Sequence, residues 1–129
     1  MANGFTIDTS EPRALGADLG RVPAKALPEV ESVLLRGSLN VRDDMRDEFR
    51  KSRYFRQVAP SVDAERKGSL REIAYEIGPR VGVYGGSLGG IAVDGGANGG
   101  GGTVDIDGIL PREAPALEKY LGEALEKLL

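Results

Sequence analysis

Glycines follow a short apolar segment in the second half of the chain, an arrangement that holds phosphate groups in many nucleotide-binding proteins. Val81–Tyr84 runs directly into Gly85, Gly86, Gly89 and Gly90. A loop whose backbone N–H groups cradle phosphates needs the spacing G-x-G-x-x-G or a G-K-[ST] ending, and this segment has neither. The sequence therefore predicts loop glycines here and no nucleotide cofactor.

Acidic residues near the C-terminus offer a second candidate for chemistry, a calcium loop at Asp105-Ile106-Asp107-Gly108. An EF-hand loop needs a further oxygen ligand two residues after the second aspartate, and Ile109 occupies that position. The chain also contains no histidine and no cysteine, which removes imidazole bases, thiolate nucleophiles and the usual zinc ligands. No serine has an S-x-x-K context, and Ser87, which has the G-x-S-x-G spacing at Gly85–Gly89, has no histidine in the chain to activate it. We therefore expect a protein with no enzymatic activity, no metal and no cofactor.

The most organised charge pattern is an arginine series at spacings of four, four and three: Arg42, Arg46, Arg50 and Arg53. Like charges four residues apart on a helix repel by a few tenths of a kcal/mol, so the series needs compensating acids. Asp43 beside Arg46 and Asp47 beside Lys51 are the expected partners. Three interpretations stay open: a solvated face, a contact with an acidic surface of another subunit or partner, and a contact with DNA phosphates.

Composition limits the elements that could position these residues. The chain has 129 residues and a net charge of −3, with 40% hydrophobic and 5% aromatic residues. This length predicts one domain, residues 1–129, with a thin core of Leu, Val and Ile. The near-neutral balance argues against a dedicated nucleic-acid binder. The chain contains neither a signal-peptide pattern nor an apolar stretch of membrane-spanning length, so we expect a soluble protein without membrane contact.

Helical patterns dominate the first part of the chain. Ser10-Glu11-Pro12 is a good helix start, and Leu15, Leu19 and Val22 then share one helical face, which predicts a short helix that ends near Pro23. A long amphipathic helix is expected from Pro28 to about Ser52. Its apolar stripe includes Gly37, which predicts the close approach of another helix at that residue.

After Pro60 the pattern changes to period two. Residues 61–78 predict an antiparallel hairpin with its turn at Lys67-Gly68-Ser69. Shorter strand candidates are Val81–Tyr84, Ile91–Val93 and Thr103–Ile106. We expect a flexible glycine-rich loop at about 82–103. Pro111 and Pro115 precede a final amphipathic helix with this apolar stripe: Leu117, Leu121, Ala124, Leu125 and Leu128. The expected fold is α+β, and the final helix packs on the sheet or on the long helix.

The order of several short segments resembles a family of phage proteins. After the opening amphipathic segment come R-x-x-M-R-x-E-x-R at Arg42–Arg50, A-P-S-V at Ala59–Val62, I-G-P at Ile77–Pro79, Y-x-x-x-L-G-x-I from Tyr84 through Gly89 to Ile91, and L-P-x-x-A-P-A-L-x-K-x-L at Leu110–Leu121. Together they span nearly the whole chain. In this order they resemble the neck and tail-completion proteins of long-tailed double-stranded DNA phages.

This resemblance implies a structural virion protein at the head–tail junction. It implies a ring of identical subunits, a hexamer by tail symmetry, between the head connector or stopper and the tail tube. DNA would pass through without specific binding, and the protein would be in the host cytoplasm during assembly and in the virion neck or tail afterwards. Candidate interface residues are the arginine series with Tyr84 and Gly89. Two alternatives stay open: a tail-terminator ring, and a small cytoplasmic α+β binding module or regulator.

Overall fold

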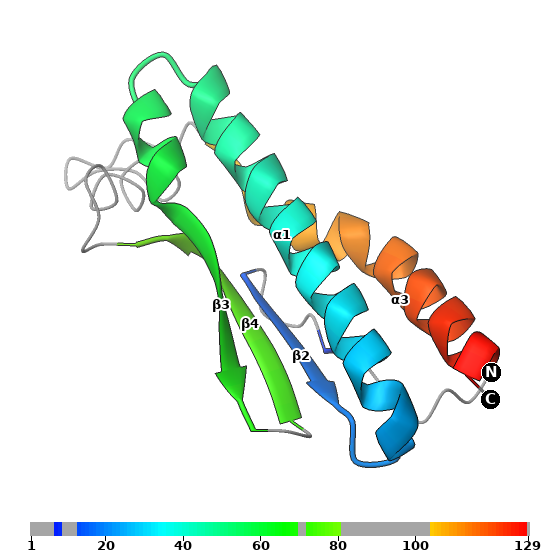
Figure 1. Cartoon of the computed structure of the whole chain (residues 1–129). Coiled ribbons are helices and arrows are strands. Elements are labelled where there is room, and N and C mark those ends of the chain that lie inside the picture. Colours follow the sequence, from blue (N-terminus) through cyan, green and yellow to red (C-terminus); the bar gives the residue numbers. More distant parts are fainter. Residues whose placement is uncertain (1–6, 9–12, 70–71, 81–103, 129) are drawn as a thin grey trace.

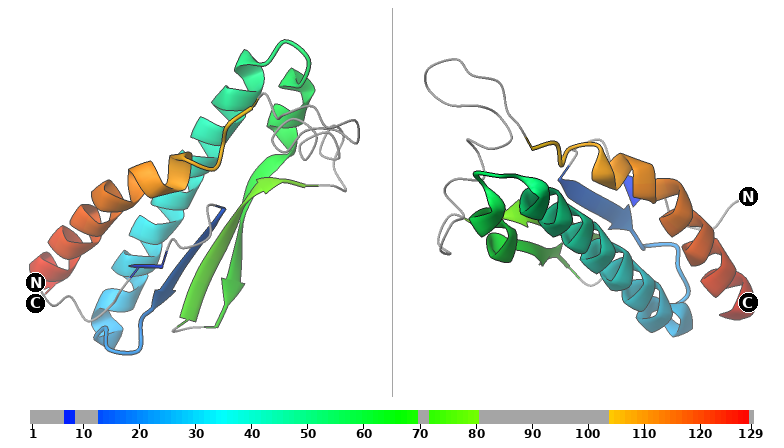
Figure 2. Two further views of the ribbon diagram at one scale, coloured as in Figure 1. Left: turned by 180° about the vertical axis from the view of Figure 1, so that it is seen from behind. Right: turned by 90° about the horizontal axis from the view of Figure 1, so that it is seen from above.

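The protein is an α+β domain with two long helices on one face of an antiparallel sheet (Figures 1 and 2). The computed structural model describes residues 7–8, 13–69, 72–80 and 104–128. The strands are β1 (Ile7–Asp8), β2 (Ala14–Asp18), β3 (Val62–Gly68) and β4 (Glu72–Pro79). The long helices are α1 (Leu27–Lys51) and α3 (Ile109–Leu128), and two short 3₁₀ helices are η1 (Ala24–Ala26) and η2 (Arg56–Ser61). The α+β class expected from the sequence is confirmed.

The sheet has the strand order β1-β2-β4-β3, and every neighbouring pair is antiparallel. Residues that pair across an antiparallel sheet share a face. Leu15 pairs with Tyr75, and Ala17 pairs with Ile73. These four residues are buried, whereas their neighbours along the strands are half-buried or exposed. The buried face carries the core, and α1 lies along it (Figure 2).

Helix α1 follows the expected long helix closely. Pro28 lies in its first turn, where proline's fixed φ fits and its missing N–H costs nothing. The stripe that faces the core repeats at spacings of three and four and is fully buried: Val30, Leu34, Ser38, Val41, Met45 and Phe49. The helix ends at Lys51, and the backbone of the next residue, Ser52, is extended. Burial of each large apolar side chain of this stripe stabilises the fold by roughly 1.5–3 kcal/mol.

The short helix predicted to begin at Ser10 is wrong, because the structure has β2 at Ala14–Asp18. Leu15, Leu19 and Val22 do fit one helical face, but Leu15 and Ala17 also fit the period of a half-buried strand. All five residues of β2 pair with β4, so sheet pairing satisfies this backbone in place of helical hydrogen bonds. The local pattern of this segment allowed a helix or a strand, and its pairing with β4 determined that it forms a strand.

The hairpin is confirmed as β3 and β4, with the turn placed later than expected. Lys67 and Gly68 belong to β3 rather than to the turn. Gly68 has φ of +93°, and a Cβ there would overlap the Glu72 carbonyl oxygen. Only glycine fits this position. Ser69 N–H then donates to Glu72 O at 2.7 Å and closes the hairpin.

Helix α3 packs beside α1, as one of the two predicted arrangements has it (Figure 1). It begins at Ile109, and Pro115 lies inside the helix rather than before it. Proline's φ fits a helix even though it donates no backbone hydrogen bond. The close approach predicted at Gly37 is confirmed: a Cβ on Gly37 would lie 2.6 Å from Cδ1 of Leu117 in α3.

Several sequence predictions lie outside the described residues. These are the strands at Val81–Tyr84 and Ile91–Val93 and the glycine-rich loop at about 82–103. The strand predicted at Thr103–Ile106 is not found in its described part, because Val104–Ile106 forms no strand. Val104 and Ile106 are instead buried against the core in the segment that leads into α3.

Candidate functional site

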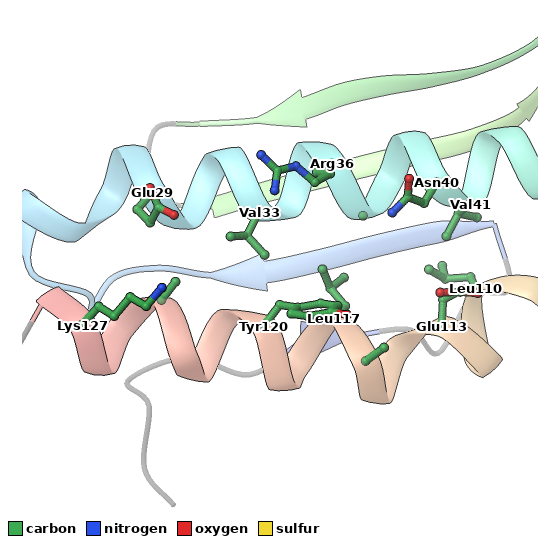
Figure 3. A pocket seen from close by; sticks show the side chains of 13 residues that line it. Glu29, Val33, Arg36, Asn40, Val41, Leu110, Glu113, Leu117, Tyr120 and Lys127 are labelled. Atoms are coloured by element: carbon green, nitrogen blue, oxygen red, sulfur yellow. The ribbon is translucent and has the colours of Figure 1, made fainter.

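A groove with a volume of about 680 Å³ runs between α1 and α3 (Figure 3). We call it the interhelical groove. Side chains from both helices point into it, among them Val33 and Val41 from α1 and Leu110 and Leu117 from α3. Its complete lining is Glu29, Val33, Arg36, Gly37, Asn40, Val41, Leu110, Glu113, Ala116, Leu117, Tyr120, Ala124 and Lys127. Most of this lining is apolar.

Small residues create the groove. Gly37 lets Leu117 approach the backbone of α1, so the two helices come close at one point. Ala116 and Ala124 are too small to fill the space on either side of that contact. The helices therefore touch at Gly37 and Leu117 and leave an apolar hollow that the chain's own described side chains do not fill.

Four charged residues surround this apolar floor: Glu29 and Arg36 on α1, and Glu113 and Lys127 on α3. None of the four forms an ion pair with another described residue. Tyr120 also lines the groove and is 59% exposed, which is unusual for an aromatic side chain of this size. An apolar floor, an exposed tyrosine and rim charges without an ion pair among the described residues suit the binding of another apolar surface.

A second hollow lies at one end of the sheet and has a different character. Arg13 Nε donates to Asp107 Oδ1 at 2.8 Å. Arg80 contacts Asp63 at 3.5 Å and Glu65 at 3.2 Å, and Lys67 Nζ contacts Glu76 at 2.9 Å. We call these residues the ion-paired sheet surface: Arg13, Asp63, Glu65, Lys67, Glu76, Arg80 and Asp107. The charges here already have partners within the chain.

Electrostatics agrees with this pairing. The hydrogen bond and charge of Glu76 raise the pKa of Lys67 above its ordinary value. On the opposite face of the sheet, burial raises the pKa of Tyr75, because the phenolate form would lose its hydration. Neither pKa shifts toward neutral pH.

The arginine series does not form one uniform stripe. Arg42 pairs with Asp43 at 3.0 Å, and Arg50 pairs with Asp47 at 2.7 Å. The partners expected from the sequence, Asp43 for Arg46 and Asp47 for Lys51, are therefore wrong. Each acid instead pairs with an arginine one or three residues away that its short side chain can reach.

Arg46 and Arg53 complete the series in different ways. Arg46 Nε donates to the backbone carbonyl of Val62 at 3.0 Å and so ties α1 to β3. Arg53 lies beyond the end of α1, and its guanidinium is 5.7 Å from the centroid of the Tyr54 ring. Tyr54 is 71% exposed. Only the end of the series, around Arg50, Arg53 and Tyr54, is an exposed surface.

Lys51 belongs to the same end of α1. Its Nζ contacts Glu48 Oε2 at 2.8 Å, and this hydrogen bond and charge raise the pKa of Lys51. Local acids thus neutralise part of the basic surface, as the interpretation of a solvated face requires. Arg53 differs, because its described partner is the ring of Tyr54 and not a carboxylate.

The remaining sequence predictions concern Tyr84, Gly89 and the calcium loop. Tyr84 and Gly89 lie outside the described residues. Within the described part of the chain, no group of acidic residues is arranged to hold a metal ion. In the segment Asp105-Ile106-Asp107-Gly108, Asp107 takes part in the ion pair with Arg13.

Sequence reasoning did not find the interhelical groove. It found Gly37 and the apolar stripe of α3, but it assigned both to packing within the core. The sequence feature that could have predicted the groove is a set of uncharged residues beside the buried stripes rather than on them: Val33, Ala116 and Tyr120. A second apolar row beside the core stripe of each helix indicates a surface that is open between the helices.

None of the described helices is long and apolar enough to cross a membrane. A scan against protein-family models found no matching family, and searches of curated proteins and of solved structures found no significant match.

Proposed function

We propose that the protein is a structural subunit of a phage virion that acts at the head–tail junction as a neck or tail-completion protein. Its subunits would form a ring, a hexamer by tail symmetry, between the head connector or stopper and the tail tube. The proposal starts from the order of sequence segments described above. Its structural support is the way in which those segments contact one another.

The observation that carries the proposal is the pairing of A-P-S-V with I-G-P. These two segments lie on the two strands of the hairpin, and Val62 pairs with Pro79 at the end of the β3–β4 ladder. Arg80 N–H also donates to Ser61 O at 2.9 Å. Ser61 and Ile77 are buried. Residues from both segments of the pattern thus contact one another at one end of the hairpin. Such contacts support the view that the pattern is kept for structural reasons.

The segment L-P-x-x-A-P-A-L-x-K-x-L supports the proposal in the same way. It forms most of α3, and its Leu110, Leu117 and Leu121 are buried. Leu117 contacts α1 at Gly37. These leucines fix α3 beside the long helix, so the last segment of the pattern is also a structural contact.

The exposed end of the arginine series is the surface that we assign to ring formation. Arg53 and Tyr54 form a stacked pair next to Arg50, and arginine and tyrosine are enriched where proteins contact one another. An acidic patch of a neighbouring subunit suits this surface. The net charge of −3 also suits a conduit, because a mildly acidic subunit gains little from contact with phosphates.

The direct test is the composition of the virion. In particles of the phage that encodes the chain, we expect the protein at a small fixed copy number, with antibody labels at the junction of head and tail. Labels at the tail-tube end of the neck would favour the tail-terminator alternative. Complete absence from washed, infectious particles would contradict the proposal.

A variant tests the assigned ring surface. We expect Arg50→Glu combined with Arg53→Glu to reduce ring assembly or head–tail joining and to leave the fold intact, since both residues are exposed. Arg46 is left unchanged because its hydrogen bond to Val62 stabilises the fold. Lys119→Glu on exposed α3 is the matched control. Normal joining by the double variant would contradict this surface.

The interhelical groove favours a second candidate, a small binding module without a virion role. Its volume of about 680 Å³ is within the range of pockets that hold small ligands. This candidate predicts a monomer that binds one apolar small molecule in the groove. A bound metabolite that copurifies with the chain, together with absence from particles, would favour it over the virion role.

A further inference from the structure

We infer that the free chain forms a two-fold dimer in which the interhelical grooves of two copies close on each other. The inference concerns a surface other than the proposed ring contact, and it does not rest on the proposed function. It rests on the order of charged and aromatic residues along the groove.

The groove has three levels along its length (Figure 3). At one end, Glu29 of α1 and Lys127 of α3 lie at the same level. Arg36 and Tyr120 lie at the middle level, and Asn40 of α1 and Glu113 of α3 lie at the other end. At each level, one helix carries a group that complements a group on the other helix.

This order makes the surface complementary to itself. A two-fold axis parallel to the helices turns one copy face-down onto the other and puts α1 of each copy over α3 of the other, level with level. Glu29 of one copy then faces Lys127 of the other, and the same contact occurs twice. The guanidinium of Arg36 lies over the ring of Tyr120, a favourable cation–π arrangement. The amide of Asn40 faces the carboxylate of Glu113 as a hydrogen-bond donor.

The other in-plane axis does not give this result. A two-fold axis perpendicular to the helices puts α1 over α1 and α3 over α3. Lys127 then faces Glu113 of the other copy, but Glu29 faces Asn40 and no cation, and Arg36 faces Arg36. Arg36 then has no aromatic partner. The parallel axis satisfies Glu29, Arg36, Lys127 and Glu113 together, and none of these forms an ion pair with another described residue.

Exposed apolar surface beside the floor supplies the driving force for the dimer. Val41 and Leu117 on the floor are already buried, whereas Val33 is half-buried and Tyr120 is 59% exposed in the single chain. In the dimer each Tyr120 packs against the other copy, which removes its apolar area from water twice. The rim charges favour the parallel axis, because the perpendicular axis leaves Glu29 without a cation and brings Arg36 of the two copies together.

Sedimentation equilibrium of the full chain tests the dimer. We expect reversible association to twice the chain mass. Glu29→Lys is expected to raise the dissociation constant about tenfold, because two symmetric attractions become repulsions. Glu29→Lys combined with Lys127→Glu is expected to restore association, since the pairing is reversed but kept. The matched control is Lys119→Glu, an exposed α3 residue outside the groove lining.

Cross-linking tests the axis, and the absence of native cysteine makes it specific. We expect a mixture of the Glu29→Cys and Lys127→Cys variants to form a disulfide-linked dimer on mild oxidation. A mixture of Glu29→Cys and Lys119→Cys should form far less. Cross-linking of Glu29→Cys with Asn40→Cys instead would overturn the parallel axis.

Other outcomes also decide the inference. A chain that stays monomeric at all concentrations overturns it, as does a dimer that is insensitive to Glu29→Lys. Direct association into rings without a dimer overturns it while favouring the proposed function. Absence from virions, by contrast, would contradict the proposed function and leave the dimer intact, so the two failures are distinguishable.

Discussion

The interhelical groove and the ion-paired sheet surface are both hollows with charged residues, but they differ in whether those charges form ion pairs within the described chain. At the sheet, Arg13, Lys67 and Arg80 each contact a carboxylate of the chain itself. At the groove, Glu29 and Lys127 have no such partner among the described residues. Exposed ion pairs each contribute up to about 1 kcal/mol, so a surface that stays in water gains a little by pairing its charges internally. The dimer that we propose would give the charges of the groove their partners in a second copy.

The largest expected effect is at the floor of the groove. We predict that Leu117→Ala destabilises the protein by about 2–5 kcal/mol, because it removes the buried contact that holds α3 to α1. Chemical denaturation measures the change. In this background Gly37→Ala should recover part of the loss, because the added Cβ enters the vacated space and alanine favours a helix. A further loss on adding Gly37→Ala would show that the helices approach elsewhere.

A smaller effect is expected where α1 meets the sheet. Arg46→Met is predicted to cost about 1–2 kcal/mol, because the Val62 carbonyl loses a charged hydrogen-bond donor. Arg50→Met removes an exposed ion pair and should change the unfolding free energy by less than about 0.5 kcal/mol. The same denaturation assay compares them. Equal effects would mean that the hydrogen bond of Arg46 to Val62 adds nothing to the stability of the fold.

The comparison of the two hollows is sharpest for a pair of charge changes. Arg80→Met should lower stability by at most about 1 kcal/mol, with a loss that shrinks in salt, and leave the oligomeric state unchanged. Glu29→Lys places a cation in the first turn of α1, so it should lower stability by no more than about 1 kcal/mol, and it should weaken association. If Arg80→Met altered association instead, the sheet surface would be the contact and the comparison would fail.

The smallest effect is a dependence on alkaline pH. The pKa of Tyr75 is raised above its ordinary value of 10.0, and those of Lys51 and Lys67 above 10.5. A raised pKa in the folded state gives stability that is present at lower pH and lost as pH rises through the folded value. We therefore predict a fall in unfolding free energy as pH rises above 10.0, smaller in Tyr75→Phe. An identical fall in Tyr75→Phe would assign the effect to the lysines.

The sequence predicts those parts of the fold in which local pattern and burial agree. The stripe from Val30 to Phe49 has one clear period, so α1 is predicted almost to its ends. Gly37 is informative because a glycine on the apolar stripe of a helix leaves room for a neighbouring helix to approach. The β3–β4 hairpin follows from its alternation, although its turn is predicted too early.

The failures have physical causes as well. Ala14–Asp18 holds only two buried side chains, so the hydrogen bonds of β4 determine its structure, and these lie more than fifty residues further along the chain. The groove depends on how far apart α1 and α3 lie on either side of the Gly37 contact, and a sequence pattern along one helix does not contain that distance. The acids near the arginine series are misassigned because rotamers, not spacing alone, select the partner of a short Asp side chain.

Two exposed tyrosines allow the most direct test of the claim that a protein chain covers the groove. Tyr120 lines the groove and is 59% exposed, whereas Tyr54 lies outside it and is 71% exposed. Hydroxyl-radical footprinting of the free chain at rising protein concentration measures both side chains in one sample. We predict that the oxidation rate of Tyr120 falls as dimers form, while that of Tyr54, which lies on the proposed ring surface, stays constant as long as no rings form. A constant rate for Tyr120 in a sample that has associated would contradict the account.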